Sequence, residues 1–199
     1  MDRLLWVLLI LTLSLFALYT PVNTPRGEIY SFKTIVDDYI PLWTSFLIFY
    51  ISYYVLLVFT FIYLFRKQKY GLLKNTLVAA IICYSVTYIF YWFFQNGIER
   101  PVIINRNVFD AIYTWINSWL APYNAFPSLH VATSVICAIS FYKARSSLFK
   151  SVLIWAVLIC ASTVLTKQHY FLDIPGGVVI GCVSFWIGEY LMKRKVRIW

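Results

Sequence analysis

Charged residues are scarce in this chain: only 13% of its 199 residues are Asp, Glu, Lys or Arg. A soluble globular domain has about 25% charged residues, so this composition excludes that class. Hydrophobic residues make up 61% of the chain and aromatic residues 20%, which indicates an integral membrane protein. Histidine is scarcer still, with two in the whole chain. Polar groups that such a protein keeps near hydrocarbon are functional candidates.

The chain also lacks internal repeats, low-complexity tracts and Pro/Gly-rich linkers. We therefore predict one transmembrane domain over residues 1–199, with an anchor span and outer loop at 1–42 and a motif-bearing core at 75–192. The four cysteines lie in apolar stretches and have neither metal-type nor disulfide-type spacing, so we expect them to pack in the core.

Six apolar runs approach the roughly 20 residues that a helix needs to cross the hydrocarbon layer. They are Leu4–Thr20, Trp43–Phe65, Asn75–Phe94, Ser128–Tyr142, Ser147–Thr166 and Tyr170–Met192. The first run lacks a small-residue cleavage pattern, so we interpret it as an uncleaved anchor and not as a signal peptide. The fold class that we predict is all-α, an integral membrane bundle of six transmembrane helices.

Basic residues are unevenly distributed between the connections. With a cytoplasmic N-terminus, 12 of the 17 Lys and Arg residues fall on the cytoplasmic side, as the positive-inside rule requires. They are Arg3, Arg66, Lys67, Lys69, Lys74, Lys143, Arg145, Lys150, Lys193, Arg194, Lys195 and Arg197. We therefore expect a multi-pass protein of the cytoplasmic membrane with both termini in the cytoplasm. The net charge of +9 then indicates anionic lipid as a partner, and not nucleic acid.

Two outer segments are longer than the other connections. We interpret Pro21–Leu42 as a surface loop with an interfacial helix. Within Gly97–Phe126, apolar residues recur at helical spacing, which predicts an amphipathic helix in the headgroup layer. These residues are Val108, Ile112, Trp115, Ile116 and Trp119.

His169 and Asp173 are four residues apart, which places them on one face of a helix. A carboxylate there accepts the imidazole Nδ1 proton and leaves Nε2 free to attack or to accept a proton. Capping of the sixth helix is the alternative role for this pair. Pro175 predicts a kink beneath the site, because a proline within an established helix interrupts its hydrogen bonds.

A second polar cluster, Pro127-Ser128-Leu129-His130, begins the fourth run. Ser128 is a typical N-cap, and the helix N-terminus behind it favours a phosphate while His130 protonates a leaving oxygen. The alternative is a capped helix with an interfacial histidine. Arg100-Pro101 follows the third run, where a guanidinium either binds phosphate in a bidentate manner or lies at the interface without a ligand. The predicted topology places all three elements on the outer side.

In order and spacing these residues resemble the type 2 phosphatidic acid phosphatase superfamily. The family pattern is a Lys, six residues and Arg-Pro; then Pro-Ser-Gly-His; then Ser-Arg, five residues, His, three residues and Asp. Arg100-Pro101 matches the end of the first motif and the Pro127 cluster the second. Ser162, His169 and Asp173 match the third.

The chain departs from that pattern at three positions. Phe93 replaces the first-motif lysine, Thr163 the third-motif arginine and Leu129 the glycine. Lys167 lies close enough in sequence to His169 to supply one missing cation. The combination most resembles the branch that contains the inositol phosphorylceramide synthases, which implies transfer of phosphate to an alcohol.

The resemblance implies an active site at the extracytoplasmic ends of helices four and six. There His169 takes the phosphoryl group as phosphohistidine, Asp173 orients it, and His130 acts as general acid and then as base. No metal or other cofactor is expected. The residues expected to hold the phosphate are Arg100, Ser128, Lys167 and Ser162.

Three functions remain open at this stage. The first is metal-independent hydrolysis of a lipid phosphate or diphosphate at the outer membrane face. The second is a phosphotransferase that moves a phosphorylated headgroup to a lipid, sugar or inositol. The third is a non-catalytic lipid-binding or transport protein, which would need neither the two histidines nor Asp173. A proton-coupled transporter is disfavoured, since no acidic residue lies at mid-membrane depth.

Overall fold

The computed structural model describes residues 2–104 and 106–196, and over these the regular elements are helices, with two isolated β-bridges between loop residues. Arg197, one of the predicted cytoplasmic basic residues, lies outside the described residues. In chain order the elements are α1 (Arg3–Ala17), α2 (Tyr19–Val22), α3 (Ile35–Tyr39), the 3-10 helix η1 (Thr44–Phe46), α4 (Leu47–Arg66), α5 (Tyr70–Phe93), α6 (Val108–Trp119), α7 (Leu129–Lys143), α8 (Phe149–Leu165) and α9 (Asp173–Val196).

Helices occupy all six of the predicted apolar runs. Four stretches in the described part of the chain are long and apolar enough to cross a membrane: α1 with α2, η1 with α4, α5, and α9. The other two helices are shorter, with 15 residues in α7 and 17 in α8. At 1.5 Å per residue they span about 22 Å and 25 Å, less than the hydrocarbon thickness of about 30 Å. The all-α membrane fold is thus confirmed, whereas six complete crossings are not.

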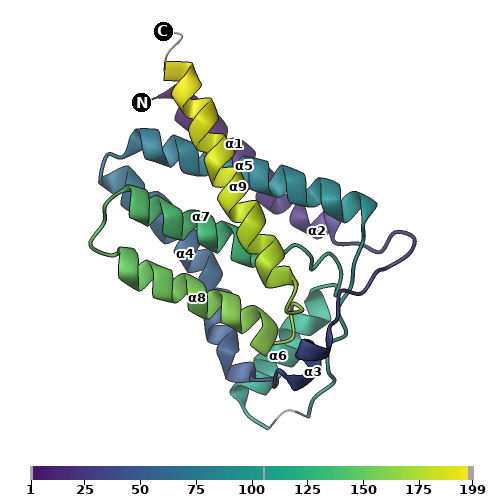
Figure 1. The fold of residues 1–199 in the computed structure, drawn as a ribbon. Coiled ribbons are helices and arrows are strands. Elements are labelled where there is room, and N and C mark those ends of the chain that lie inside the picture. The colour runs from purple at the N-terminus through teal and green to yellow at the C-terminus, as the bar shows by residue number, and fades with distance from the viewer. Residues whose placement is uncertain (1, 105, 197–199) are drawn as a thin grey trace.

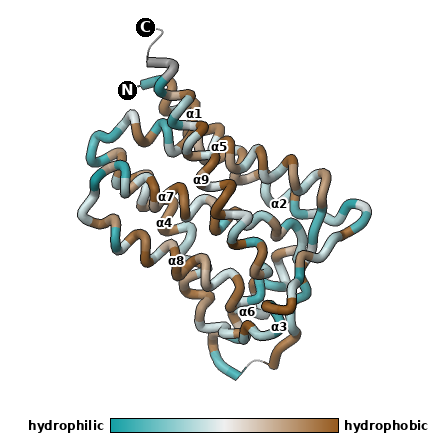
Figure 2. Tube along the Cα trace, in the orientation of Figure 1, coloured by the Kyte–Doolittle hydropathy of each residue, from teal (hydrophilic) through white to brown (hydrophobic). Residues whose placement is uncertain are grey.

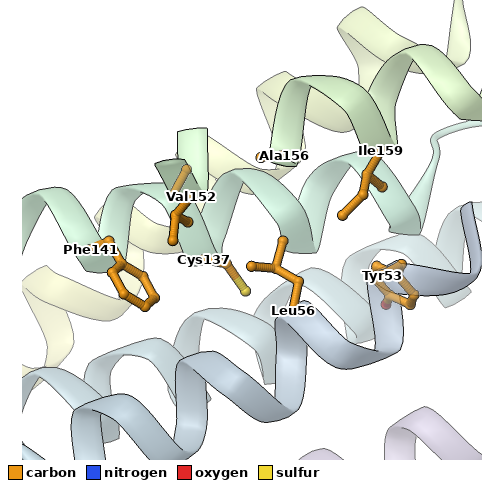
Figure 3. Packing of buried hydrophobic residues seen from close by; sticks show 8 residues of the cluster. Tyr53, Leu56, Cys137, Phe141, Val152, Ala156 and Ile159 are labelled. Atoms are coloured by element: carbon orange, nitrogen blue, oxygen red, sulfur yellow. The ribbon is translucent and has the colours of Figure 1, made fainter. Parts of the chain in front are cut away.

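α7 is the central helix and packs against α4, α5, α8 and α9. One hydrophobic cluster joins α4, α7 and α8 (Figure 3). Its buried residues are Tyr53, Leu56, Cys137, Ala138, Phe141, Val152, Ala156 and Ile159. Because lipid tails are as apolar as these side chains, van der Waals packing within the cluster, and not removal from water, holds the two shorter helices in the bundle. Cys83 and Cys137 are buried as expected, but the expectation of core packing is wrong for Cys182, which is exposed.

Two glycines allow α9 to approach α7 very closely. A Cβ atom on Gly181 would lie 2.4 Å from the Ala132 carbonyl oxygen, and one on Gly177 would lie 2.7 Å from the Ser128 carbonyl oxygen. Any side chain here would force the helices apart. The close contact brings the beginnings of the two helices together, and the Ser128 amide donates to the Asp173 carbonyl at 3.3 Å.

Figure 1 shows both chain ends and the α4–α5 and α7–α8 turns toward one end of the bundle, with α3 and α6 at the opposite end. Hydrophobic residues predominate along the long helices, and hydrophilic residues gather in those turns and in the outer loops (Figure 2). The turns carry the predicted cytoplasmic cations Lys67 and Arg145. The histidine clusters lie where α7 and α9 begin, at the end of the bundle opposite these turns.

The outer segment forms the expected amphipathic helix, α6. Ile112 and Ile116 pack against a cluster that contains Leu47 and Tyr113, while Trp115 and Trp119 are exposed. The side chain of Asn96 then holds the segment before α7, since its Oδ1 accepts from the amides of residues 125 and 126 and its Nδ2 donates to the residue 126 carbonyl. These bonds position the start of α7.

Candidate active site

A cavity of about 240 Å³ opens at the end of the bundle where α7 and α9 begin. Arg100, His130 and His169 all line it. The remaining wall is largely aromatic, with seven tyrosines: Tyr19, Tyr50, Tyr53, Tyr54, Tyr84, Tyr91 and Tyr123. Residues from distant parts of the sequence therefore meet in one partly enclosed pocket.

His169 lies in the short connection between α8 and α9, so the prediction that it shares a helix face with Asp173 is wrong. α9 begins at Asp173. The connection starts where α8 ends with Lys167 in the left-handed conformation, φ 50°, and the amides of Gln168 and His169 both donate to the Thr163 carbonyl at 3.0 Å. Pro175 falls in the first turn of α9, where proline breaks no helical hydrogen bond, so the predicted kink is also wrong.

The spacing of His169 and Asp173 nevertheless brings their side chains into contact. His169 Nδ1 lies 3.0 Å from Asp173 Oδ2, which also accepts the Tyr170 amide at 3.0 Å. Asp173 is fully buried, and a buried carboxylate needs such partners. The acceptor at Nδ1 places the imidazole proton on that nitrogen and leaves a lone pair on Nε2.

Ser128 contacts the other nitrogen of His169. It is the N-cap of α7, as predicted, and its Oγ accepts the Val131 amide at 3.4 Å. The same Oγ lies 3.2 Å from His169 Nε2, to which its hydroxyl donates when Nδ1 carries the proton. A phosphorus atom approaching Nε2 would therefore arrive beside both a hydroxyl and the α7 N-terminus.

His130 lies in the first turn of α7, opposite His169, with their ring centroids 5.7 Å apart. Its ring stacks on Tyr50 at 4.4 Å and lies tilted against Tyr53, also at 4.4 Å. The His130 Nε2 atom is buried and has no hydrogen-bond partner among the described residues. A buried nitrogen without a partner is costly unless a ligand satisfies it.

Arg100 supplies positive charge to the cavity. One of its terminal nitrogens donates to the Leu120 carbonyl at 2.5 Å, whereas its buried Nε has no partner in the described part of the chain. Burial lowers the pKa of the guanidinium from its ordinary value, but an arginine remains charged at neutral pH. The free Nε–H and the positive charge suit an anionic ligand.

Three of the four predicted phosphate-binding residues, Ser128, Lys167 and Ser162, do not line the cavity. The Lys167 ammonium donates to the Asp37 carbonyl at 2.7 Å and so fastens the α8–α9 connection to the outer loop. The Ser162 hydroxyl donates to the Ile159 carbonyl at 2.6 Å. Phe93, at the position of the family lysine, is 71% exposed.

Several residues of the cavity were not anticipated from the sequence. Tyr50 and Tyr53 contact His130 from α4, and the Tyr91 hydroxyl donates to the Pro127 carbonyl at 2.8 Å. Gln168 lines the wall with its Oε1 unpaired among the described residues. The three-residue spacing of Tyr50 and Tyr53 is a signal for a shared helix face, but aromatic residues are too common in this chain for that spacing to be distinctive.

One family model matches a part of the chain that includes several of these residues. Residues 104–187 match the family model described as PAP2 superfamily, and this range contains both histidines, Ser128 and Asp173. Arg100 and the two tyrosines of α4 lie outside it. No curated protein and no solved structure matches the chain.

Proposed function

We propose that this protein is a lipid phosphate phosphatase or phosphotransferase that works through a phosphohistidine on His169. The match of residues 104–187 to the PAP2 superfamily supports this class of reaction. The observation that carries the proposal is the arrangement of Asp173, His169 and Ser128 in one hydrogen-bonded row, with His130 facing it across 5.7 Å. A nucleophile with an orienting carboxylate and a second acid–base group opposite is the arrangement that covalent catalysis requires.

In the first half of the reaction the substrate phosphate enters between the two imidazoles. The Ser128 hydroxyl turns from Nε2 to a phosphate oxygen, and Arg100 neutralises the developing charge. Nε2 of His169 forms a bond to phosphorus as the bond from phosphorus to the leaving oxygen breaks. A protonated His130 gives its proton to that oxygen, and Asp173 stabilises the positive imidazole.

In the second half an acceptor hydroxyl takes the place of the leaving group. His130, now neutral, accepts the proton of this hydroxyl as its oxygen attacks phosphorus, and the bond to Nε2 breaks. Water as acceptor gives phosphate and a phosphatase. An alcohol as acceptor gives a new phosphate ester, and the resemblance of the motifs to the inositol phosphorylceramide synthase branch makes this the second candidate activity.

A purely lipid-binding role is disfavoured by the buried groups. Asp173 is fully buried against His169, and the His130 Nε2 atom is buried without a partner among the described residues. Both features cost stability, and groups of this kind concentrate at catalytic sites. A protein that only bound lipid would gain nothing from them.

We place this site at the outer face of the membrane, with six crossings and both termini in the cytoplasm. The basic residues at the opposite end of the bundle support this orientation. α7 and α8 then cross the membrane where the bilayer is locally thinned, since a bilayer accommodates a short hydrophobic helix by thinning around it. The site lies at headgroup depth, where a lipid phosphate is found.

The test is phosphate release by the purified protein in detergent. The panel contains phosphatidic acid, phosphatidylglycerol phosphate and undecaprenyl diphosphate, each with and without a chelator. Release that persists with the chelator and is lost in His169→Ala is expected. Full activity of His169→Ala would overturn the assignment. Product analysis with added alcohols distinguishes transfer from hydrolysis.

A further inference from the structure

A second cavity, of about 220 Å³, lies between α1, α4, α5 and α7. We propose that it binds one hydrocarbon chain of the lipid whose phosphate reacts at His169, an inference that rests on the proposed function. The lining of this cavity is almost entirely apolar, and we call the cavity the chain groove. The lining residues are Leu9, Thr12, Leu13, Phe16, Leu57, Val58, Thr60, Phe61, Leu73, Thr76, Leu77, Ala80, Tyr84, Thr133, Ile136 and Cys137.

The four threonines do not make the chain groove polar. Each hydroxyl donates to the carbonyl four residues earlier in its own helix, at 2.7 to 2.9 Å. Their hydrogen bonds are therefore satisfied within the helices, and among the described residues no side-chain nitrogen or oxygen of this lining is buried without a hydrogen-bond partner. Such a wall suits a guest without hydrogen-bonding groups.

The chain groove adjoins the catalytic cavity. Phe16 and Tyr84 line both spaces, and their rings meet edge to face at 6.4 Å. A lipid with its phosphate beside His169 must direct its chains away from the charged and polar groups around it, and the apolar space lies directly behind this shared boundary. The shared wall with the reacting site is what identifies the occupant as a substrate chain.

The depth of the groove also fits a lipid chain. Along α5 the lining of the groove extends from Leu73 to Tyr84, which are eleven positions apart and so separated by about 16 Å of helical rise. That is roughly half of the hydrocarbon layer. At the far end Leu73 and Leu77 pack in a hydrophobic cluster with Leu5 and Leu8 of α1. α1 packs mainly on α5 and so forms one wall of the groove. The side of the groove between α1 and α4 is left open to lipid.

The experiment compares long and short substrates in variants of the groove. Ala80→Phe places a ring inside it, and Leu13→Trp does so from α1, where Leu13 is 57% exposed and its replacement disturbs little packing. The control is Val86→Phe, which adds the same ring to α5 at an exposed position outside the groove lining. Hexadecyl phosphate and butyl phosphate are the two substrates.

We expect both groove variants to lower kcat/KM for hexadecyl phosphate by about tenfold or more and to change that for butyl phosphate by less than about twofold. Val86→Phe should leave both values near wild type. Equal losses with the two substrates, or no loss with either, would overturn the chain groove. Absence of release from both substrates in the wild type would instead count against the proposed function.

A binding measurement tests the groove without turnover. Wild type is irradiated with a hexadecyl phosphate that carries a diazirine in its chain, and the labelled peptides are identified by mass spectrometry. Labels on α1, α4, α5 and α7 within the groove lining, reduced by excess hexadecyl phosphate, are expected. Labels confined to exposed positions such as Ile89 and Trp186 would show that the chain stays in the surrounding lipid or detergent.

Discussion

The carboxylate of Asp173 determines which nitrogen of His169 is free to react. Its Oδ2 accepts from both His169 Nδ1 and the Tyr170 amide, so its orientation is set before any ligand binds. Asn has the same shape, and with its oxygen in the Oδ2 position it still accepts from both the Tyr170 amide and His169 Nδ1. The Asp173→Asn variant thus removes the negative charge and keeps both hydrogen bonds.

We expect Asp173→Asn to lower kcat by about a thousandfold, because a neutral amide no longer stabilises the positive imidazole that forms when His169 takes the phosphoryl group. The rate is measured with saturating lipid phosphate, and thermal unfolding in detergent is followed in parallel. An unchanged midpoint together with a lost rate supports a role of the carboxylate charge in the reaction. A rate near wild type would show that Asp173 only caps α9.

Tyr50 positions His130 through ring stacking at 4.4 Å. Tyr50→Phe keeps the ring and should keep kcat within about twofold of wild type, whereas Tyr50→Leu should lower kcat by about tenfold, since aromatic stacking contributes about 0.5–1.5 kcal/mol. KM for the lipid should change little in either variant. Equal rates in the two variants, or a rise in KM with kcat unchanged, would contradict a positioning role.

At the scale of the helices, contact between α7 and α9 assembles the site. α7 carries His130 and is capped by Ser128, and α9 begins with Asp173, so the separation of these helices sets the distances between the reacting groups. Gly177 and Gly181 determine that separation, because a Cβ on either would collide with backbone atoms of α7. The short α8–α9 connection then places His169 between them.

Gly181→Ala is expected to destabilise the bundle by about 1–3 kcal/mol, since the added methyl would lie 2.4 Å from the Ala132 carbonyl oxygen. Thermal unfolding of the purified protein measures the loss, and activity should fall with it. Gly71→Ala is the matched control, because a Cβ there has no atom within 4 Å. Equal midpoints for the two variants would show that α7 and α9 tolerate a wider spacing.

Over the whole molecule, the position of the site relative to the membrane depends on whether α7 and α8 cross it completely. Single cysteines in a background without the native ones test this. Glu28→Cys should react with a membrane-impermeant maleimide in intact cells, and Ser147→Cys, in the α7–α8 turn, only after permeabilisation, because the positive-inside rule places that turn in the cytoplasm.

Reversed labelling would contradict the orientation. Labelling of Ser147→Cys from neither side would indicate that α7 and α8 enter the membrane and return without crossing it. In that case the site would still face the end of the bundle with α3 and α6, because its geometry does not depend on the number of crossings.

Much of the fold could be predicted because hydrophobicity is a local property. Each apolar run contains a helix whose ends lie within a few residues of the predicted ones, and α6 forms where indole and aliphatic residues recur at helical spacing. The sequence did not reveal whether Pro175 bends a helix. That depends on where α9 begins, and hydrogen bonds from the Tyr170 amide and at the end of α8 decide it.

The candidate site was predicted in part for the same reason. A capping serine is a local pattern, and it correctly indicated that Ser128 caps α7. Asp173 contacts His169 as expected, but from the first residue of α9 to the preceding connection and not along one helix face. The contact of Tyr50 with His130 joins residues far apart in the chain, so no local pattern could show it. The Lys167 side chain lies outside the cavity because Lys167 itself has the left-handed conformation at the end of α8, which directs its ammonium toward the Asp37 carbonyl.

By itself the sequence determined that this is a helical membrane protein with basic residues at one end and two histidine motifs at the other, since composition and spacing suffice for that. Only the tertiary structure decided which polar groups share a cavity, that Arg100 lines it while Ser128, Lys167 and Ser162 do not, and that an apolar groove adjoins it. The physical reason is that a cavity is formed by the packing of several helices, and packing depends on contacts between residues that are distant in the chain.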